Sequence, residues 1–168
     1  MKILPANTNY ALLAIQLLII ILLITFLIIG IINLQDYFDF TGDYHGISSI
    51  YDTSISHGYF RPALILLIPT IGIFIKKKVG WILITSYFYF VLTNILFSFI
   101  LHDDYNDYII ILSVMGIITL IVFIVIIMNT KKISLTKYNI QRSVLILYNI
   151  AAFIIGVAIT IYLAFTSL

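Results

Sequence analysis

The chain has 168 residues, of which 62% are hydrophobic and only 10% are charged, and its formal net charge is +2. Soluble domains carry about 25% charged residues, and a soluble fold of this size leaves too much surface wet to hide so many aliphatic side chains. The composition therefore excludes a soluble globular protein. It predicts an all-α integral membrane protein with a single transmembrane domain over residues 1–168.

Four segments are long and apolar enough to cross a bilayer. A spanning helix needs about 20 mostly apolar residues, and residues 10–34, 81–101, 108–128 and 143–166 meet this requirement. No small-residue cleavage site follows the first segment. We therefore expect it to be a retained helix that also serves as the insertion signal.

The fifth candidate span, residues 59–75, is at the lower limit of length. Arg61 lies at one end and Lys76 follows the other, so both cations can reach outward from the membrane. Pro62 suits the first turn of a helix. Pro69 predicts a kink, which membrane helices tolerate. We expect this segment to span.

The charged residues are separated along the chain. All seven acidic residues are aspartates in residues 35–59 and 102–107, and of the nine basic residues only Arg61 lies next to one of these stretches. Since basic loops stay in the cytoplasm, the pattern predicts a five-helix transmembrane bundle with the N-terminus inside, the C-terminus outside and KKKVG as a tight inner turn. The alternative has four spans and a re-entrant segment at residues 57–78. The expected location is a bacterial cytoplasmic membrane.

Small and weakly polar side chains recur at steps of three and four in the last segment, and such stripes let membrane helices approach closely. The stripe contains Asn149, Ala152, Gly156, Thr160 and Ala164, and comparable positions elsewhere are Ser86, Asn94, Ser98, Ser113 and Gly116. We expect packing inside the bundle. The second interpretation is a seam for a homo-oligomer or a membrane partner.

The outer loop, residues 35–58, has aromatic residues at helical spacing beside a row of aspartates, which is typical of a helix lying at the membrane interface. Three histidines share this predicted face with the aspartates. The weak candidates for metal ligands are His45, His57, His102, Asp43, Asp103 and Asp104. Their spacing matches no known metal loop, so we expect solvated side chains, no metal and no cofactor. Arg61 is the expected outer anchor, through a loop aspartate or a lipid phosphate.

The functional expectation follows from the polar residues. No ionisable residue lies in the middle of a predicted span, which argues against a proton-driven transporter, and no catalytic set or nucleic-acid-binding pattern is present. We expect a non-enzymatic membrane protein that acts through contacts with a membrane partner, as an accessory, regulatory or immunity-type protein. The alternatives are an oligomeric channel or transporter subunit with an acidic outer mouth, and an enzyme with Asp/His chemistry at the outer surface.

Overall fold

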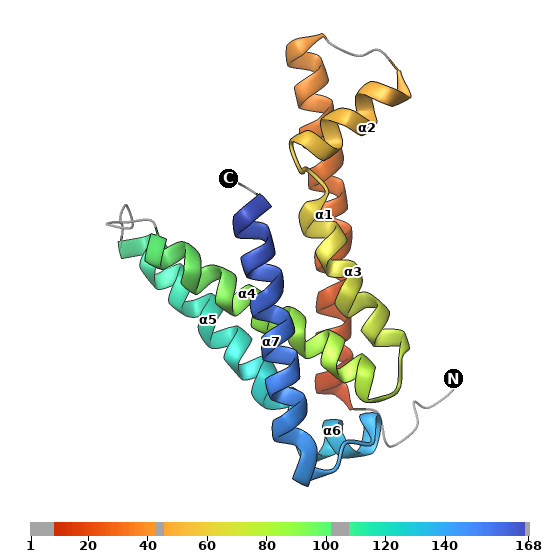
Figure 1. Cartoon of the computed structure of the whole chain (residues 1–168), viewed down its shortest axis with the longest axis vertical. Coiled ribbons are helices and arrows are strands. Elements are labelled where there is room, and N and C mark those ends of the chain that lie inside the picture. Colours follow the sequence, from red (N-terminus) through yellow and green to blue (C-terminus); the bar gives the residue numbers. More distant parts are fainter. Residues whose placement is uncertain (1–8, 43–45, 102–107, 167–168) are drawn as a thin grey trace.

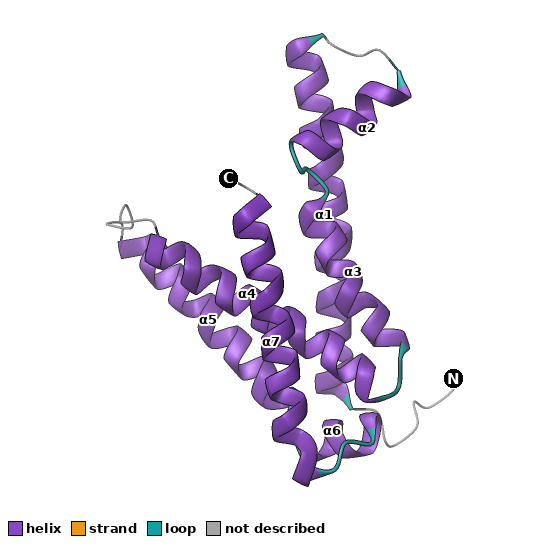
Figure 2. Ribbon diagram, viewed as in Figure 1, coloured by secondary structure: helices purple, strands orange, loops and turns teal. Residues whose placement is uncertain are grey.

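The computed structural model describes residues 9–42, 46–101 and 108–166. All of the regular elements in these ranges are helices, as the composition predicts (Figures 1 and 2). In chain order they are α1 (Tyr10–Thr41), α2 (Ile47–Ser56), α3 (Arg61–Phe74), α4 (Lys78–Leu101), α5 (Tyr108–Met128), α6 (Lys131–Tyr138) and α7 (Arg142–Thr166).

Four helices, α1, α4, α5 and α7, are long and apolar enough to cross a membrane. Helices α2 and α3 pass the same test only as a pair, and they are bent by 82° at the break between them. The chain is therefore a helical bundle of the multi-pass membrane class. Its described residues contain four candidate spans, or five if the bent pair counts as one.

Helix α4 is the centre of the bundle, because it contacts α7, α3, α5 and α6. Figure 1 shows α1 and α3 side by side as one arm, α4 and α5 leaning away as a second arm, and α7 crossing α4. The buried cluster draws on both arms, with Ile19 of α1, Leu66 of α3 and Ile84 of α4 almost completely covered. Function must therefore be sought where the arms meet and where they separate.

Helix α1 continues to Thr41 rather than ending near residue 34. It stops at Gly42, which has a left-handed backbone (φ 70°) and whose N–H bonds the carbonyl of Phe38, as is common at helix C-termini. Residues 35–41 of the expected outer loop are thus the last two turns of α1. The second half contains α2, whose exposed face carries an apolar row of Ile47, Tyr51 and Ile55.

The turn between α3 and α4 is shorter than KKKVG, because Lys78 already begins α4. Gly80 explains the difference. A Cβ at Gly80 would overlap the carbonyl oxygen of Ile75 and lie 2.6 Å from that of Gly72, so only glycine lets the two helices meet this closely. The connection then needs only residues 75–77.

The basic connection after α5 contains a helix, α6, which hydropathy alone does not predict. Ile133 and Tyr138 are 1% and 3% exposed, so α6 is held by packing into the bundle. Asn139 ends it with a left-handed backbone (φ 53°). Burial raises the pKa of the Tyr138 phenol, and a hydrogen bond with Gln16 of α1 partly opposes that rise.

Candidate functional site

The stripe on α7 lies against α4. A Cβ added at Gly156 would be 2.7 Å from the backbone nitrogen of Phe90 and 2.9 Å from the carbonyl oxygen of Ser86. Ala152 and Ser86 are fully buried. The centre of the stripe is therefore a contact between two backbones of the same chain, so this part of it is not available to another protein.

The same seam carries hydroxyl groups. The side-chain oxygens of Thr93 and Thr160 are 2.7 Å apart, and the Thr160 hydroxyl also donates to the carbonyl of Gly156 at 3.2 Å. Toward the end of α7, Ala164 is half-buried, as is Ser98 on α4. Asn94 is exposed and belongs to a cavity described below. The predicted stripe residues are thus divided between a packed seam and a more open end.

A reciprocal pair of amides joins α7 to the end of α5. Asn149 donates from Nδ2 to Oδ1 of Asn129 at 2.6 Å, and Asn129 donates from Nδ2 to Oδ1 of Asn149 at 3.2 Å. The Tyr89 hydroxyl adds a third helix, since it donates to the same Asn149 oxygen at 3.0 Å. Sequence reasoning singled out Asn149 but missed Asn129 and Tyr89. The sequence signal that could have indicated Asn129 is its place directly after the apolar run 108–128.

The α4–α5 hairpin is closed at one end by Trp81. This side chain is 0% exposed, and its Nε1 donates to the carbonyl of Met128 at 2.9 Å. The bond satisfies a carbonyl in the last turn of α5, which has no partner within its own helix. Farther from this end, no residue from Tyr108 to Leu120 of α5 is buried.

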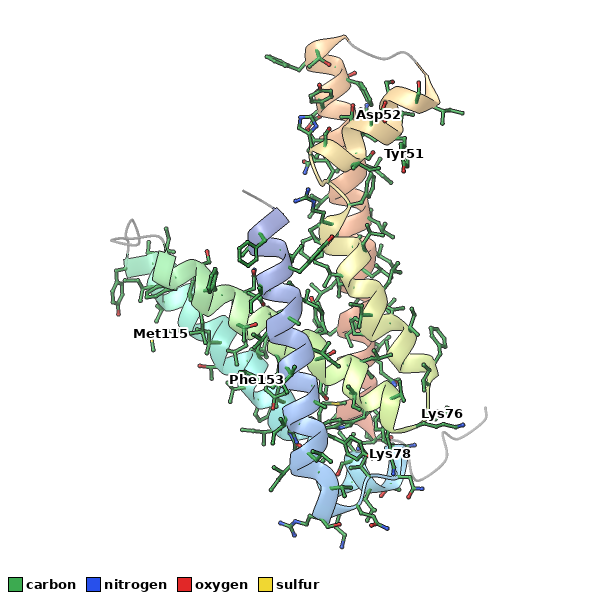
Figure 3. All side chains as sticks on the ribbon, in the orientation of Figure 1. Tyr51, Asp52, Lys76, Lys78, Met115 and Phe153 are labelled. Carbon is green, nitrogen blue, oxygen red and sulfur yellow. The ribbon has the colours of Figure 1, made fainter. Side chains whose placement is uncertain are left out.

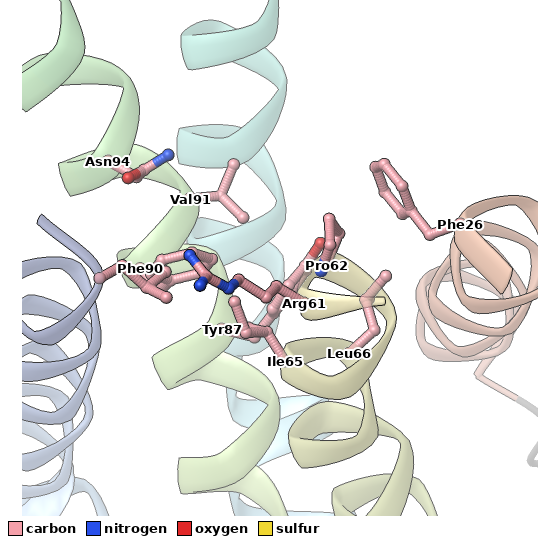
Figure 4. A pocket seen from close by; sticks show the side chains of 10 residues that line it. Phe26, Arg61, Pro62, Ile65, Leu66, Tyr87, Phe90, Val91 and Asn94 are labelled. Atoms are coloured by element: carbon pink, nitrogen blue, oxygen red, sulfur yellow. The ribbon is translucent and has the colours of Figure 1, made fainter. Parts of the chain in front are cut away.

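Where the two arms separate, the bundle leaves a half-open cavity of about 340 Å³ (Figure 4). Four helices line it, and most of the lining is apolar. The lining includes Phe26 of α1, Arg61 and Ile65 of α3, Val91 and Asn94 of α4, and Leu163 of α7. Figure 4 shows the Arg61 side chain reaching from α3 toward α4.

Arg61 is positioned by the turn that precedes it. Its N–H donates to the carbonyl of Gly58 at 2.9 Å, and a Cβ at Gly58 would lie 2.6 Å from Cδ of Arg61. Gly58 also has a positive φ of 64°. The glycine therefore both permits the bend between α2 and α3 and leaves room for the arginine side chain to cross it.

His57 is the one weak metal candidate within the described residues. Its ring is stacked on Tyr59 at 5.3 Å and lies 4.7 Å from the ring of Tyr37 of α1, and Nδ1 is 3.0 Å from the Ser56 hydroxyl. This environment is an aromatic contact between helices. His45, His102, Asp43, Asp103 and Asp104 lie outside the described residues, and within those residues no three potential ligands gather.

Helix α5 presents an open surface that includes small residues. A Cβ added at Gly116 would meet nothing within 4 Å, and Ser113, one turn earlier, is exposed with its hydroxyl bonded to the carbonyl of Ile109 at 2.8 Å. Leu112 and Leu120 flank them and are more than half exposed. We call Leu112, Ser113, Gly116 and Leu120 the outer face of α5.

Comparison of the chain with protein-family models, with curated proteins and with solved structures finds no match. The class that the fold defines is therefore a helical multi-pass membrane protein, on the strength of its four to five apolar helices.

Proposed function

We propose that the chain crosses the membrane five times, with α3 as a short second span. Phe60, which precedes α3, packs against Gly30, since a Cβ there would be 2.8 Å from the Phe60 ring. At about 1.5 Å per residue, α1 covers about 30 Å from Tyr10 to Gly30, which is about one hydrocarbon thickness. Figure 1 shows α3 running back beside this part of α1, toward its first turn.

The charges support the same topology. The exposed Lys76 and Lys78 lie at one end of the molecule and Asp52 at the other (Figure 3). Helix α6, with its exposed lysines, packs beside α4 at the lysine end. The positive-inside tendency places that end in the cytoplasm. We therefore propose an internal N-terminus, an external C-terminus and a bacterial cytoplasmic membrane.

Within that topology, we propose that the protein acts without catalysis, by binding a helix of another membrane protein. The observation that carries this proposal is the contrast between two glycines. Gly156 is filled by the backbone of α4, whereas Gly116 is open, on a helix in which no residue from Tyr108 to Leu120 is buried. Small residues on a membrane helix favour close approach of a second helix, so the outer face of α5 is the surface that we assign to the partner.

The proposed role is accessory, regulatory or immunity-type, because each of these roles acts through contact with a membrane partner. A channel or transporter subunit is the alternative, and it also requires assembly, since α4 and its neighbours pack directly against one another. The acidic residues of the outer end, such as Asp36 and Asp39 of α1, would then attract cations to its mouth.

Mild-detergent extraction followed by size and composition analysis tests the proposal. The wild-type chain should retain a second membrane protein in fixed stoichiometry, and Gly116→Leu should release it because the added side chain holds the helices apart. Ala158→Leu is the matched control, since Ala158 is also a small exposed residue but lies on α7. A monomeric chain with enzymatic turnover would overturn the proposal. Single-channel currents from the pure protein in a planar bilayer would favour the alternative.

A further inference from the structure

A second surface, independent of the α5 face, lies in the fissure between the arms. Its cavity of about 340 Å³ falls in the size range of ligand sites, which are mostly apolar with a few placed polar groups. Phe26, Ile65, Val91 and Leu163 supply the apolar walls from four different helices. A protein helix is too wide for a cavity of this volume, whereas a single hydrocarbon chain is not.

The polar groups of the cavity define its second property. Among the described residues that line it, Arg61 is the one cation and none is a carboxylate. Asn94 adds an amide that donates hydrogen bonds. A guanidinium presents its donors in a planar fork that matches phosphate oxygens. The cavity therefore has an anion-binding group beside apolar walls.

The position of Arg61 along the membrane normal matches the level at which a lipid head group meets its acyl chains. Arg61 follows Phe60, whose ring packs on Gly30, and Gly30 is about one hydrocarbon thickness from the start of α1. Gly58 leaves the space that the arginine side chain occupies as it crosses the turn. In the five-span arrangement proposed above, on which this step rests, the cation lies at one boundary of the apolar layer, next to the lipid phosphates.

We infer that this fissure binds one anionic phospholipid, with its phosphate at Arg61 and an acyl chain along Ile65, Val91 and Leu163. The arginine gives the site its preference for negative charge, and the apolar walls distinguish a lipid from a free phosphate ion. Bound in this way, the lipid bridges the α1–α3 arm and the α4–α7 pair, so it fills the opening of the bundle.

Native mass spectrometry of the full chain in a neutral detergent measures this binding directly. Phosphatidylglycerol, phosphatidylcholine and inorganic phosphate are titrated separately. We expect one phosphatidylglycerol per chain, weaker phosphatidylcholine binding and no competition by inorganic phosphate. Arg61→Gln should weaken phosphatidylglycerol binding about tenfold, the change that corresponds to about 1.4 kcal/mol. Val91→Phe should weaken binding of both lipids, because the larger side chain occupies the path of the acyl chain.

Arg142→Gln is the matched control, since Arg142 is an exposed arginine at the opposite end of the bundle. It should leave the first phosphatidylglycerol in place. Equal losses in Arg61→Gln and Arg142→Gln would show general electrostatic attraction and overturn the site. Equal affinities for the two lipids, or competition by phosphate alone, would also overturn it. Circular dichroism and elution volume confirm that each variant is folded before its binding is compared.

Discussion

The backbone nitrogen of Phe90 lies 2.7 Å from the position that a Cβ would take at Gly156. At this point α4 and α7 meet backbone to backbone, and neither side has a flexible side chain that could move away. The carbonyl oxygen of Ser86, one turn earlier on α4, lies 2.9 Å from the same position. The seam therefore depends on the absence of a single carbon atom at Gly156.

Gly156→Ala should destabilise the protein by about 1–3 kcal/mol, the usual cost of overpacking a filled contact. Reversible unfolding in mixed micelles measures the change. Gly116→Ala is the control, because nothing lies within 4 Å of its added Cβ. That variant should be unchanged, or more stable by up to about 1 kcal/mol because alanine favours the helix. Equal effects of the two substitutions would contradict the backbone contact.

The amide pair of Asn149 and Asn129 predicts coupled losses. Each amide donates to the other, and hydrogen bonds between membrane helices contribute about 0.6 kcal/mol on average and up to about 1.7 kcal/mol. Asn149→Leu and Asn129→Leu should each lower the free energy of unfolding by about 1 kcal/mol. The double variant should lose less than the sum, because the second change removes a partner that is already unpaired.

Tyr89→Phe is a control for these asparagine variants. It removes one hydroxyl donor to Asn149 and leaves the amide pair intact. Its effect should be smaller than that of either asparagine substitution. Strict additivity of the two asparagine changes would show that the amides act separately, and the network would then not be the link between α5 and α7.

Topology is tested by placing single cysteines in a chain that has none. Ser48→Cys on α2 and Thr130→Cys before α6 are both at exposed positions. In intact cells, a membrane-impermeant maleimide should label the first and spare the second, because five crossings put α2 outside and α6 inside. Both should react once the cells are opened. Protection of both positions in intact cells would instead favour the four-span arrangement with a re-entrant α3.

The sequence was sufficient to predict the helical class and the four long apolar segments, because a helix that crosses a bilayer needs about 20 mostly apolar residues and such runs are visible in the sequence. It also marked Gly156 and its neighbours as a packing stripe. It could not say which helix would meet that stripe. Spacing along α7 describes one face of one helix, whereas the choice of α4 depends on how both arms pack.

Other features had weaker signals or none. Helix α6 is short and polar, and it exists because Ile133 and Tyr138 are drawn into the bundle. Asn129 lies just beyond an apolar run, where hydropathy gives no sign of an interhelical contact. Arg61 was noticed as the one basic residue on the acidic side, but the cavity beside it is formed by four helices far apart in sequence. Such a site cannot be read from any one segment.

The single tryptophan offers a test of the closed end of the α4–α5 hairpin. Trp81 is 0% exposed, whereas Val79, two residues earlier on α4, is 54% exposed. Phospholipids with brominated acyl chains quench tryptophans that they touch. Wild-type emission should therefore be quenched weakly, and the Trp81→Phe/Val79→Trp variant strongly, although both indoles lie at nearly the same depth. Strong quenching of wild-type Trp81 would mean that lipid reaches the contact with the Met128 carbonyl, and that the two helices are not closed there.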